Sequence, residues 1–183
     1  MNTYLFSENQ KGRDGQIELF CMAYGIYVTK LLREAPNNNP EQVNKDLDQI
    51  GYKMGQRLID EFLSRCEKAQ PCKDFPQIMK AIAQDAIRMF LGTEGELRNL
   101  TKDSVSLIIK DNPLADFVQL PEGYKSSLWY SNVLCGLVRG ALEMTNVKVS
   151  CTFVKDQLRG DPETEIQVNL IEIMRDVYID EDD

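Results

Sequence analysis

Apolar and polar residues alternate along the first half of the chain with the period of amphipathic helices. In three segments the apolar residues recur three and four positions apart, as they do on the buried face of a helix. This spacing predicts helices over about residues 17–34, 40–66 and 75–91. The turn-rich stretch "EAPNNNP" separates the first two segments, and the polar stretch "CEKAQPCKD" separates the second from the third.

Residues suited to helix ends support these boundaries. Asn39 is an N-cap candidate, and it is followed by Pro40, whose fixed φ suits the first helical position. Asp74 is a second N-cap candidate, with Gln77 three residues later. Gly92 suits the position just after the third helix, where the backbone is often left-handed.

In the second half of the chain the pattern changes to the period of strands. "SVSLIIKDN" is typical of a strand, "ADFVQLP" of a short strand or a loop, and "VKVSCTFVKD" with "TEIQVNLIEI" of a hairpin. Before the hairpin, Ser126 is placed to cap a fourth helix over about residues 127–144. This order predicts an α+β fold: a small, mainly antiparallel sheet with helices packed on one face.

The length of 183 residues, 43% of them hydrophobic, suits one domain with a sizeable core. We predict a flexible N-terminal arm at residues 1–16, a single domain at residues 17–174 and an acidic C-terminal tail at residues 175–183. No stretch has the apolar length of a membrane span or the hydrophobic region of a signal peptide. With its scattered cysteines, the chain is expected to be a reduced, cytosolic protein.

The net charge of −8 and the absence of histidine exclude several functions. An acidic chain is a poor ligand for nucleic acid or anionic lipid, because both require clustered Lys and Arg. Without histidine there can be no Ser-His-Asp or Cys-His pair and no His-ligated zinc. Five cysteines without a paired CxxC arrangement do not predict a metal site either.

Cys72 is the cysteine whose position in the sequence suggests a function. It precedes the third predicted helix, where the helix dipole and Lys73 both favour the thiolate, although Asp74 opposes them. A partly activated thiol could be a redox sensor, a nucleophile or an acceptor of an acyl group, and it could equally be an inert loop cysteine.

Two pairs of glycines lie four residues apart inside predicted helices, at Gly51 and Gly55 and at Gly136 and Gly140. Each costs helix stability relative to alanine, so a packing benefit is expected. Either two helices approach closely there, or a groove between helices admits something thin and apolar.

Four blocks carry a family resemblance: "GYKMGQRLIDEFLSR", "NPLADFVQLP", "YSNVLCGLVRGALEM" and "FVKDQLRGDPETEI". Together they resemble the Bet-three-type core subunit 3 family of the TRAPP vesicle-trafficking complex, over about residues 19–171. The resemblance implies an α/β plait of four antiparallel strands covered by helices on one face, and a dimer. It also implies other TRAPP subunits as partners and a tethering complex that exchanges guanine nucleotide on a Rab-type GTPase. The place of action would be the cytoplasmic side of cis-Golgi and ER-to-Golgi membranes.

The resemblance further implies that Cys72 carries a covalent palmitate, buried in a hydrophobic channel of the protein, with no metal and no catalysis of its own beyond possible self-acylation. Pro71 and Lys73 depart from the flanks expected for the family. We predict that five residues line the channel: Ile59, Phe62, Ile82, Ala86 and Phe90. Two alternatives stay open, namely a thiol-dependent acyl transferase or peroxidase that uses Cys72, and a sensor that binds a lipid non-covalently.

Overall fold

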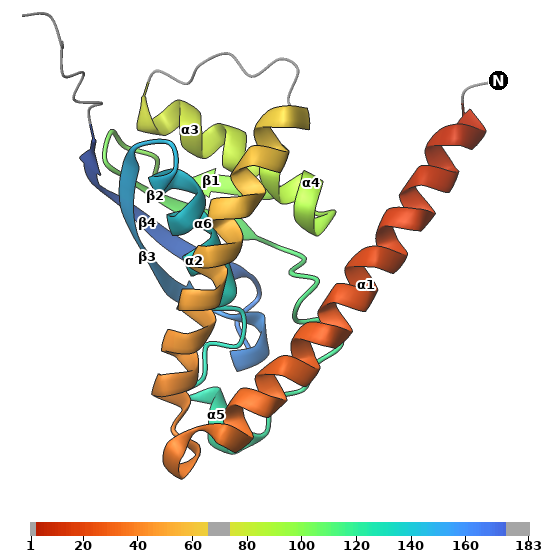
Figure 1. The fold of residues 1–183 in the computed structure, drawn as a ribbon, viewed down its shortest axis with the longest axis vertical. Helices are drawn as coiled ribbons and strands as arrows, with labels where there is room; N and C mark the ends of the chain where they lie inside the picture. Colours follow the sequence, from red (N-terminus) through yellow and green to blue (C-terminus); the bar gives the residue numbers. More distant parts are fainter. Residues whose placement is uncertain (1–2, 66–73, 175–183) are drawn as a thin grey trace, which may run out of the picture.

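A four-stranded antiparallel sheet in the order β1-β2-β4-β3 forms the centre of the fold (Figure 1). The computed structural model describes residues 3–65 and 74–174, and side chains from residue 15 onward. The strands are β1 (Gly95–Arg98), β2 (Ser104–Ile109), β3 (Val147–Lys155) and β4 (Thr164–Ile173). This confirms the predicted α+β class and the β3–β4 hairpin.

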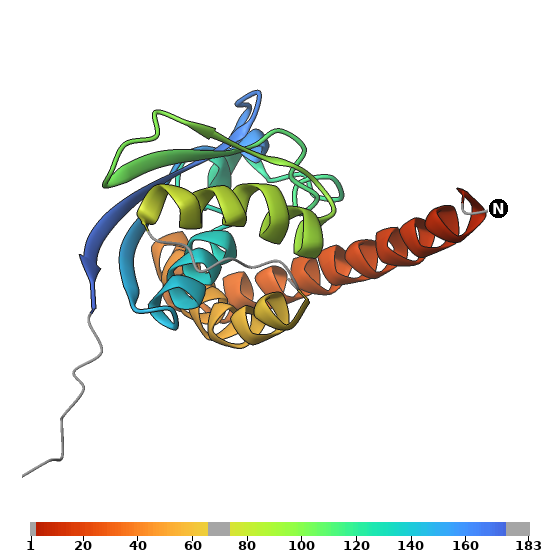
Figure 2. The same cartoon turned by 90° about the horizontal axis from the view of Figure 1, so that it is seen from above.

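Helices cover one face of this sheet (Figures 1 and 2). The helical elements are α1 (Thr3–Glu34), η1 (Pro36–Asn38), α2 (Pro40–Arg65), α3 (Phe75–Ala81), a π-helical turn η2 (Ile82–Ala86), α4 (Ile87–Leu91), α5 (Glu122–Lys125), α6 (Val133–Glu143) and η3 (Gln157–Arg159). α3, the π-helical turn and α4 follow one another without a break, as one rod from residue 75 to residue 91.

Successive side chains of β2 point to opposite faces of the sheet, and the two faces differ in what they contact. Val105, Leu107 and Ile109 are buried on the face that carries the helices. On the other face, the Ser104 hydroxyl donates to the Asn169 side chain at 3.0 Å, one of several polar side-chain bonds between β2 and β4. The polar face therefore satisfies its own hydrogen bonds, while the apolar face packs against helices.

α6 lies next to the sheet, and α2 packs on the outside of α6 (Figure 2). At the crossing of α2 and α6 the two glycine pairs meet the opposite backbone. A Cβ on Gly51 would collide with the carbonyl oxygen of Val133, and a Cβ on Gly136 would collide with that of Asp48. The glycines therefore serve close helix packing, the first of the two possibilities that the sequence left open.

α1 differs from the prediction for the N-terminus. Residues 3–16, expected to form a flexible arm, are helical and belong to α1, whose N-terminal half projects away from the rest of the protein (Figures 1 and 2). The C-terminal half of α1 is anchored by the buried residues Cys21, Tyr24 and Val28. The Tyr24 hydroxyl donates to the backbone carbonyl of Tyr130.

The predicted helix ends are largely confirmed. Asn39 accepts the N–H of Glu41 at 3.0 Å, and α2 begins at the next residue, Pro40. Asp74 accepts the N–H of Gln77 at 2.9 Å and caps α3. Gly92 ends α4 with a φ of 70°, a conformation that favours glycine.

One predicted element needs correction, one open alternative is decided, and one strand was not predicted. The helix expected over residues 127–144 begins only at Val133, because residues 126–132 form turns after the short α5. The stretch 115–121, expected to be a strand or a loop, is a loop with turns. The fourth strand of the sheet is instead β1, which the sequence analysis missed. The predicted acidic tail at residues 175–183 lies outside the described residues.

Candidate functional site

An apolar cavity of about 790 Å³ lies between the sheet, α6, α2 and the rod formed by α3, the π-helical turn and α4. Nearly all of its wall consists of Leu, Ile, Val, Phe and Ala side chains. Its volume falls within the range of roughly 300–1,000 Å³ that is typical of small-molecule sites. A wall of this kind offers water few hydrogen-bond partners, so it suits an apolar ligand.

All five residues predicted to line an acyl channel line this cavity. Ile59 and Phe62 come from the last two turns of α2, Ile82 and Ala86 from the π-helical turn, and Phe90 from α4. The structure thus brings them together from both sides of one space. Their contact with an acyl chain stays a prediction.

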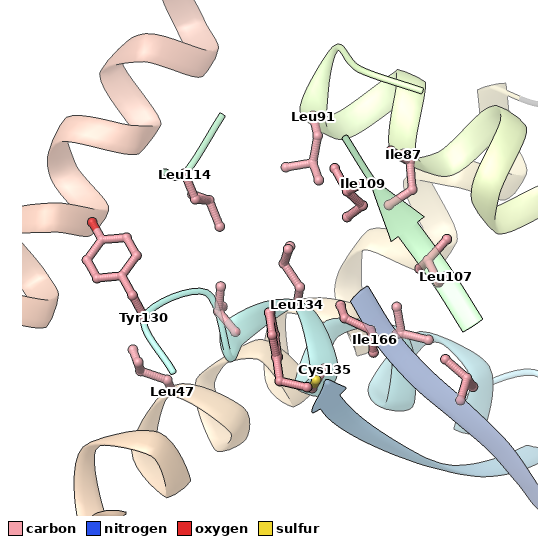
Figure 3. Packing of buried hydrophobic residues seen from close by; sticks show 14 of the residues in the cluster. Leu47, Ile87, Leu91, Leu107, Ile109, Leu114, Tyr130, Leu134, Cys135 and Ile166 are labelled. Atoms are coloured by element: carbon pink, nitrogen blue, oxygen red, sulfur yellow. The ribbon is translucent and has the colours of Figure 1, made fainter. Parts of the chain in front are cut away.

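The inner end of the cavity comes from residues that the sequence analysis did not single out. Leu107 and Ile109 of β2 and Ile166 of β4 form its floor, and Leu134 of α6 faces Leu91 of α4 across the space between them (Figure 3). These side chains are buried. The apolar spacing along α6 could have suggested that Leu134 points inward, but spacing alone does not tell a cavity wall from a solid core.

The openings of the cavity are marked by its exposed lining residues: Leu63 and Arg65 at the end of α2, Asp85 on the π-helical turn, and Thr145 after α6. Among the described lining residues, Arg65, Asp85 and Thr145 alone carry polar side chains. The Arg65 guanidinium contacts the Glu61 carboxylate at 2.5 Å.

The π-helical turn contributes directly to the cavity wall. Ile82, Asp85 and Ala86 line the cavity, while Ala83 is buried and turned toward β1. A Cβ added to Gly95 of β1 would lie 2.8 Å from the carbonyl oxygen of Ala83, so the rod and the strand approach closely there. Such single π turns inside α-helices are frequent at functional sites.

Cys72, the predicted attachment site, lies outside the described residues. The segment that contains it joins two elements that line the cavity: α2, through Phe62 and Arg65, and α3, through Ile78. Lining residues of the cavity therefore stand on both sides of this segment in the sequence, at Arg65 and Ile78.

The three described cysteines do not form a reactive site. Burial raises the pKa of the Cys21 thiol and of the Cys135 thiol, and it raises the pKa of Cys151 to about 12. These thiols stay protonated at neutral pH and are poor nucleophiles. Within residues 3–65 and 74–174, no cluster of His, Cys, Asp or Glu could hold a metal ion.

A helix long and apolar enough to cross a bilayer is likewise not found in that part of the chain. Fold and cavity together define an α+β domain with an apolar pocket whose described buried wall residues carry no acid, base or thiol. A domain of this class can accommodate an apolar ligand.

Comparison with known proteins then identifies the family. The model of the transport protein particle (TRAPP) component family matches residues 20–169. The chain is 45% identical over 162 residues to trafficking protein particle complex subunit 3 of Dictyostelium discoideum, covering 87% of this chain and 86% of that protein. It is 40% identical over 161 residues to trafficking protein particle complex subunit BET3 of Saccharomyces cerevisiae, with 87% and 82% covered.

A solved structure agrees with these relatives. Trafficking protein particle complex subunit 3 of Naegleria fowleri, covalently bound to palmitic acid, superimposes with a TM-score of 0.84 at 40% identity, covering 88% of this chain and 99% of that one. The chain belongs to the TRAPP component family and, within it, to the subunit 3 type. The resemblance noted in the sequence is thereby confirmed.

Proposed function

We propose that this chain is a non-catalytic core subunit of a TRAPP-type complex that tethers vesicles and exchanges guanine nucleotide on a Rab-type GTPase in ER-to-Golgi transport. In this proposal, Cys72 carries an S-palmitoyl group whose chain fills the cavity. The observation that carries it is the cavity itself, walled by the two helices that flank the Cys72 segment. The covalently bound palmitic acid of the Naegleria fowleri relative supports the same ligand.

Chain geometry limits how far Cys72 can lie from the start of α3. Two residue steps separate it from Asp74, the N-cap of α3, and each step spans at most about 3.6 Å. Ile78, one turn into α3, already lines the cavity. This short connection to α3 is compatible with a thioester at Cys72 whose chain enters the apolar space.

Burial of the acyl chain gives a large gross stabilisation. A palmitoyl chain has about 15 hydrocarbon carbons beyond the carbonyl, and each is worth about 0.8 kcal/mol when it leaves water. The gross gain is on the order of 12 kcal/mol, which is comparable to the net stability of a whole domain. A chain buried in this way stabilises the fold and is not available to anchor the protein in a bilayer. Location at the cytoplasmic side of ER-to-Golgi membranes then depends on the rest of the complex.

An intact-mass measurement before and after treatment with neutral hydroxylamine, which cleaves thioesters, tests the acylation. We expect the untreated protein to carry the added mass of one palmitoyl group and the treated protein to lose it, and Cys72→Ala never to acquire it. Unmodified wild-type protein from cells that acylate proteins would overturn the proposal.

Two other functions give different results. A sensor that binds lipid non-covalently would release it to organic solvent with no thioester cleavage. A thiol enzyme would turn over an acyl-CoA or a peroxide, and Cys72→Ala would abolish that turnover. The protonated state of the other described thiols and the absence of histidine make the enzyme the weaker alternative.

For the partner, we propose a second TRAPP-fold subunit, or a second copy when the chain is alone, seated on α1. Leu19, Met22 and Ile26 are spaced along one side of α1 and are 68%, 52% and 73% exposed. Phe117, in the loop that faces α1 across a groove, is 56% exposed. Light scattering tests this surface: Ile26→Asp should be monomeric at concentrations where the wild type is a dimer, and an unchanged dimer would place the interface elsewhere.

A further inference from the structure

The polar groups of the cavity are all at its openings. Arg65, Asp85 and Thr145 are the polar lining residues, and each of them is exposed. The buried lining residues that the structure describes offer no side-chain donor and no counter-ion, and an ionised carboxylate is costly to bury without one. A ligand with a charged head group must therefore keep that head at an opening.

The three polar side chains differ in what they can offer such a head group. The Arg65 guanidinium is already engaged by Glu61 at 2.5 Å. The Thr145 hydroxyl donates to the backbone carbonyl of Leu142 at 2.8 Å. Asp85 makes no ion pair or hydrogen bond with any described residue. Among the described lining side chains, the charge without a described partner is thus the negative charge of Asp85.

We propose that Asp85 is a specificity-determining residue that disfavours acyl chains with a free carboxylate and leaves the cavity to uncharged or covalently attached acyl groups. This inference rests on the proposed function, since it assumes that the cavity holds an acyl chain. A free fatty acid is ionised at neutral pH, as carboxyl groups with pKa values near 4 are, whereas a thioester is neutral. Asp85 therefore limits competition from free fatty acids for the space that the covalent chain occupies.

The size of the effect follows from the exposure of the charges. Interactions between exposed charges are worth about 0.2–1 kcal/mol, which corresponds to at most about a fivefold change in Kd. They also weaken with salt, because the screening length is about 10 Å at 0.1 M and about 3 Å at 1 M.

The test uses the full chain with Cys72→Ser, so that binding stays non-covalent, and measures the Kd of radiolabelled palmitate and of radiolabelled 1-hexadecanol at pH 7.5. Asp85→Asn should tighten palmitate binding about two- to fivefold at low salt, less at 1 M salt, and leave hexadecanol unchanged. Glu61→Gln, which frees the Arg65 guanidinium, should act in the same direction. Glu41→Gln is the matched control, because it lies about 25 Å along α2 from the first lining residue, Leu58.

The outcomes separate the two proposals. If Asp85→Asn and Glu61→Gln leave the Kd of palmitate unchanged while hexadecanol still binds, the proposed role of Asp85 is wrong. The proposal that the cavity holds an acyl chain then stands. An equal change for both ligands in Asp85→Asn would mean that the side chain acts through packing, and it overturns the charge-based role as well. If neither ligand binds to any variant, the acyl cavity itself is wrong, and the role of Asp85 falls with it.

Discussion

The crossing of α2 and α6 gives the sharpest test of the fold, because backbone meets backbone there. Gly136→Ala would place a Cβ against the carbonyl oxygen of Asp48, with the backbone nitrogen of Tyr52 only 2.7 Å away. No side-chain rotation can relieve contact with main-chain atoms, so the two helices must separate. The same two helices carry one wall of the cavity.

The expected loss combines two opposed effects. Forcing extra volume into a well-packed site costs about 1–3 kcal/mol, and occasionally more. Alanine is better than glycine inside a helix by about 1 kcal/mol, which offsets part of this cost. Because the clash involves rigid backbone, we expect a net loss of about 2 kcal/mol. With a urea m-value of about 2 kcal/mol/M, the midpoint of unfolding should fall by about 1 M.

Gly15→Ala is the matched control for this measurement. Gly15 also lies in a helix, α1, but a Cβ there would meet no atom within 4 Å. Both substitutions change the unfolded chain in the same way, so their difference reports on the folded state. Gly15→Ala should leave the midpoint unchanged or raise it, by up to about 1 kcal/mol in free energy. A Gly136→Ala protein as stable as wild type would refute the close crossing.

Three further predictions concern the cavity and one ion pair. Ala86→Leu should prevent acylation, which an intact-mass measurement would show. Ala23→Leu, on the exposed side of α1, should leave acylation unchanged. Full palmitoylation of the Ala86→Leu protein would contradict the proposed channel. Removal of the acyl group by hydroxylamine should lower the Tm of wild-type protein by several degrees. The scale is about 2–4 °C for each kcal/mol lost from the free energy of unfolding. The same treatment should leave the Tm of unacylated protein unchanged. The Arg98 guanidinium holds the pKa of the Glu163 carboxyl below its usual range. The ion pair therefore contributes to the free energy of unfolding above about pH 4.3, and this contribution is lost as the pH falls through the folded-state pKa of Glu163. Urea midpoints should therefore fall more steeply below pH 4 in wild type than in Glu163→Gln, and parallel curves would show that the pair is not linked to folding.

Local signals in the sequence predicted the elements that depend on local chemistry. The caps at Asn39 and Asp74 and the glycine at Gly92 are each decided by a few neighbouring residues, and each is present. The β3–β4 hairpin followed from alternation over two long strands.

Elements that depend on distant partners could not be predicted in the same way. β1 has four residues, "GELR", with too little alternation to mark a strand, and it exists because it pairs with β2. The π-helical turn leaves no local signal, and its Ala83 lies close to Gly95 of β1. The late start of α6 at Val133 reflects tertiary contacts too: the side chain of Asn44 on α2 accepts the N–H of Trp129 at 2.8 Å and holds the preceding turns.

The cavity was predicted in part for a physical reason. Ala86 is the small residue among the five predicted lining residues, and a small side chain among large ones leaves space; the wall contains two more alanines, Ala81 and Ala141, on opposite sides. Periodicity cannot show whether such space is filled by neighbours, because Leu107 of β2 and Leu134 of α6 have the same spacing in a solid core as in a cavity wall.

Small side chains at this wall have a consequence for what the protein needs in order to be stable. Protein interiors are normally close-packed, and a space left empty forfeits the contacts of every atom that faces it. Leucine in place of Ala81, Ala86 or Ala141 would add apolar volume and fill part of the cavity. With alanine at these positions, the chain buries less apolar surface than it could. An acyl chain restores that burial without a side chain. Under the proposed function the lipid would complete the hydrophobic core, and the acylated protein, rather than the bare polypeptide, would be the stable unit from which the complex assembles.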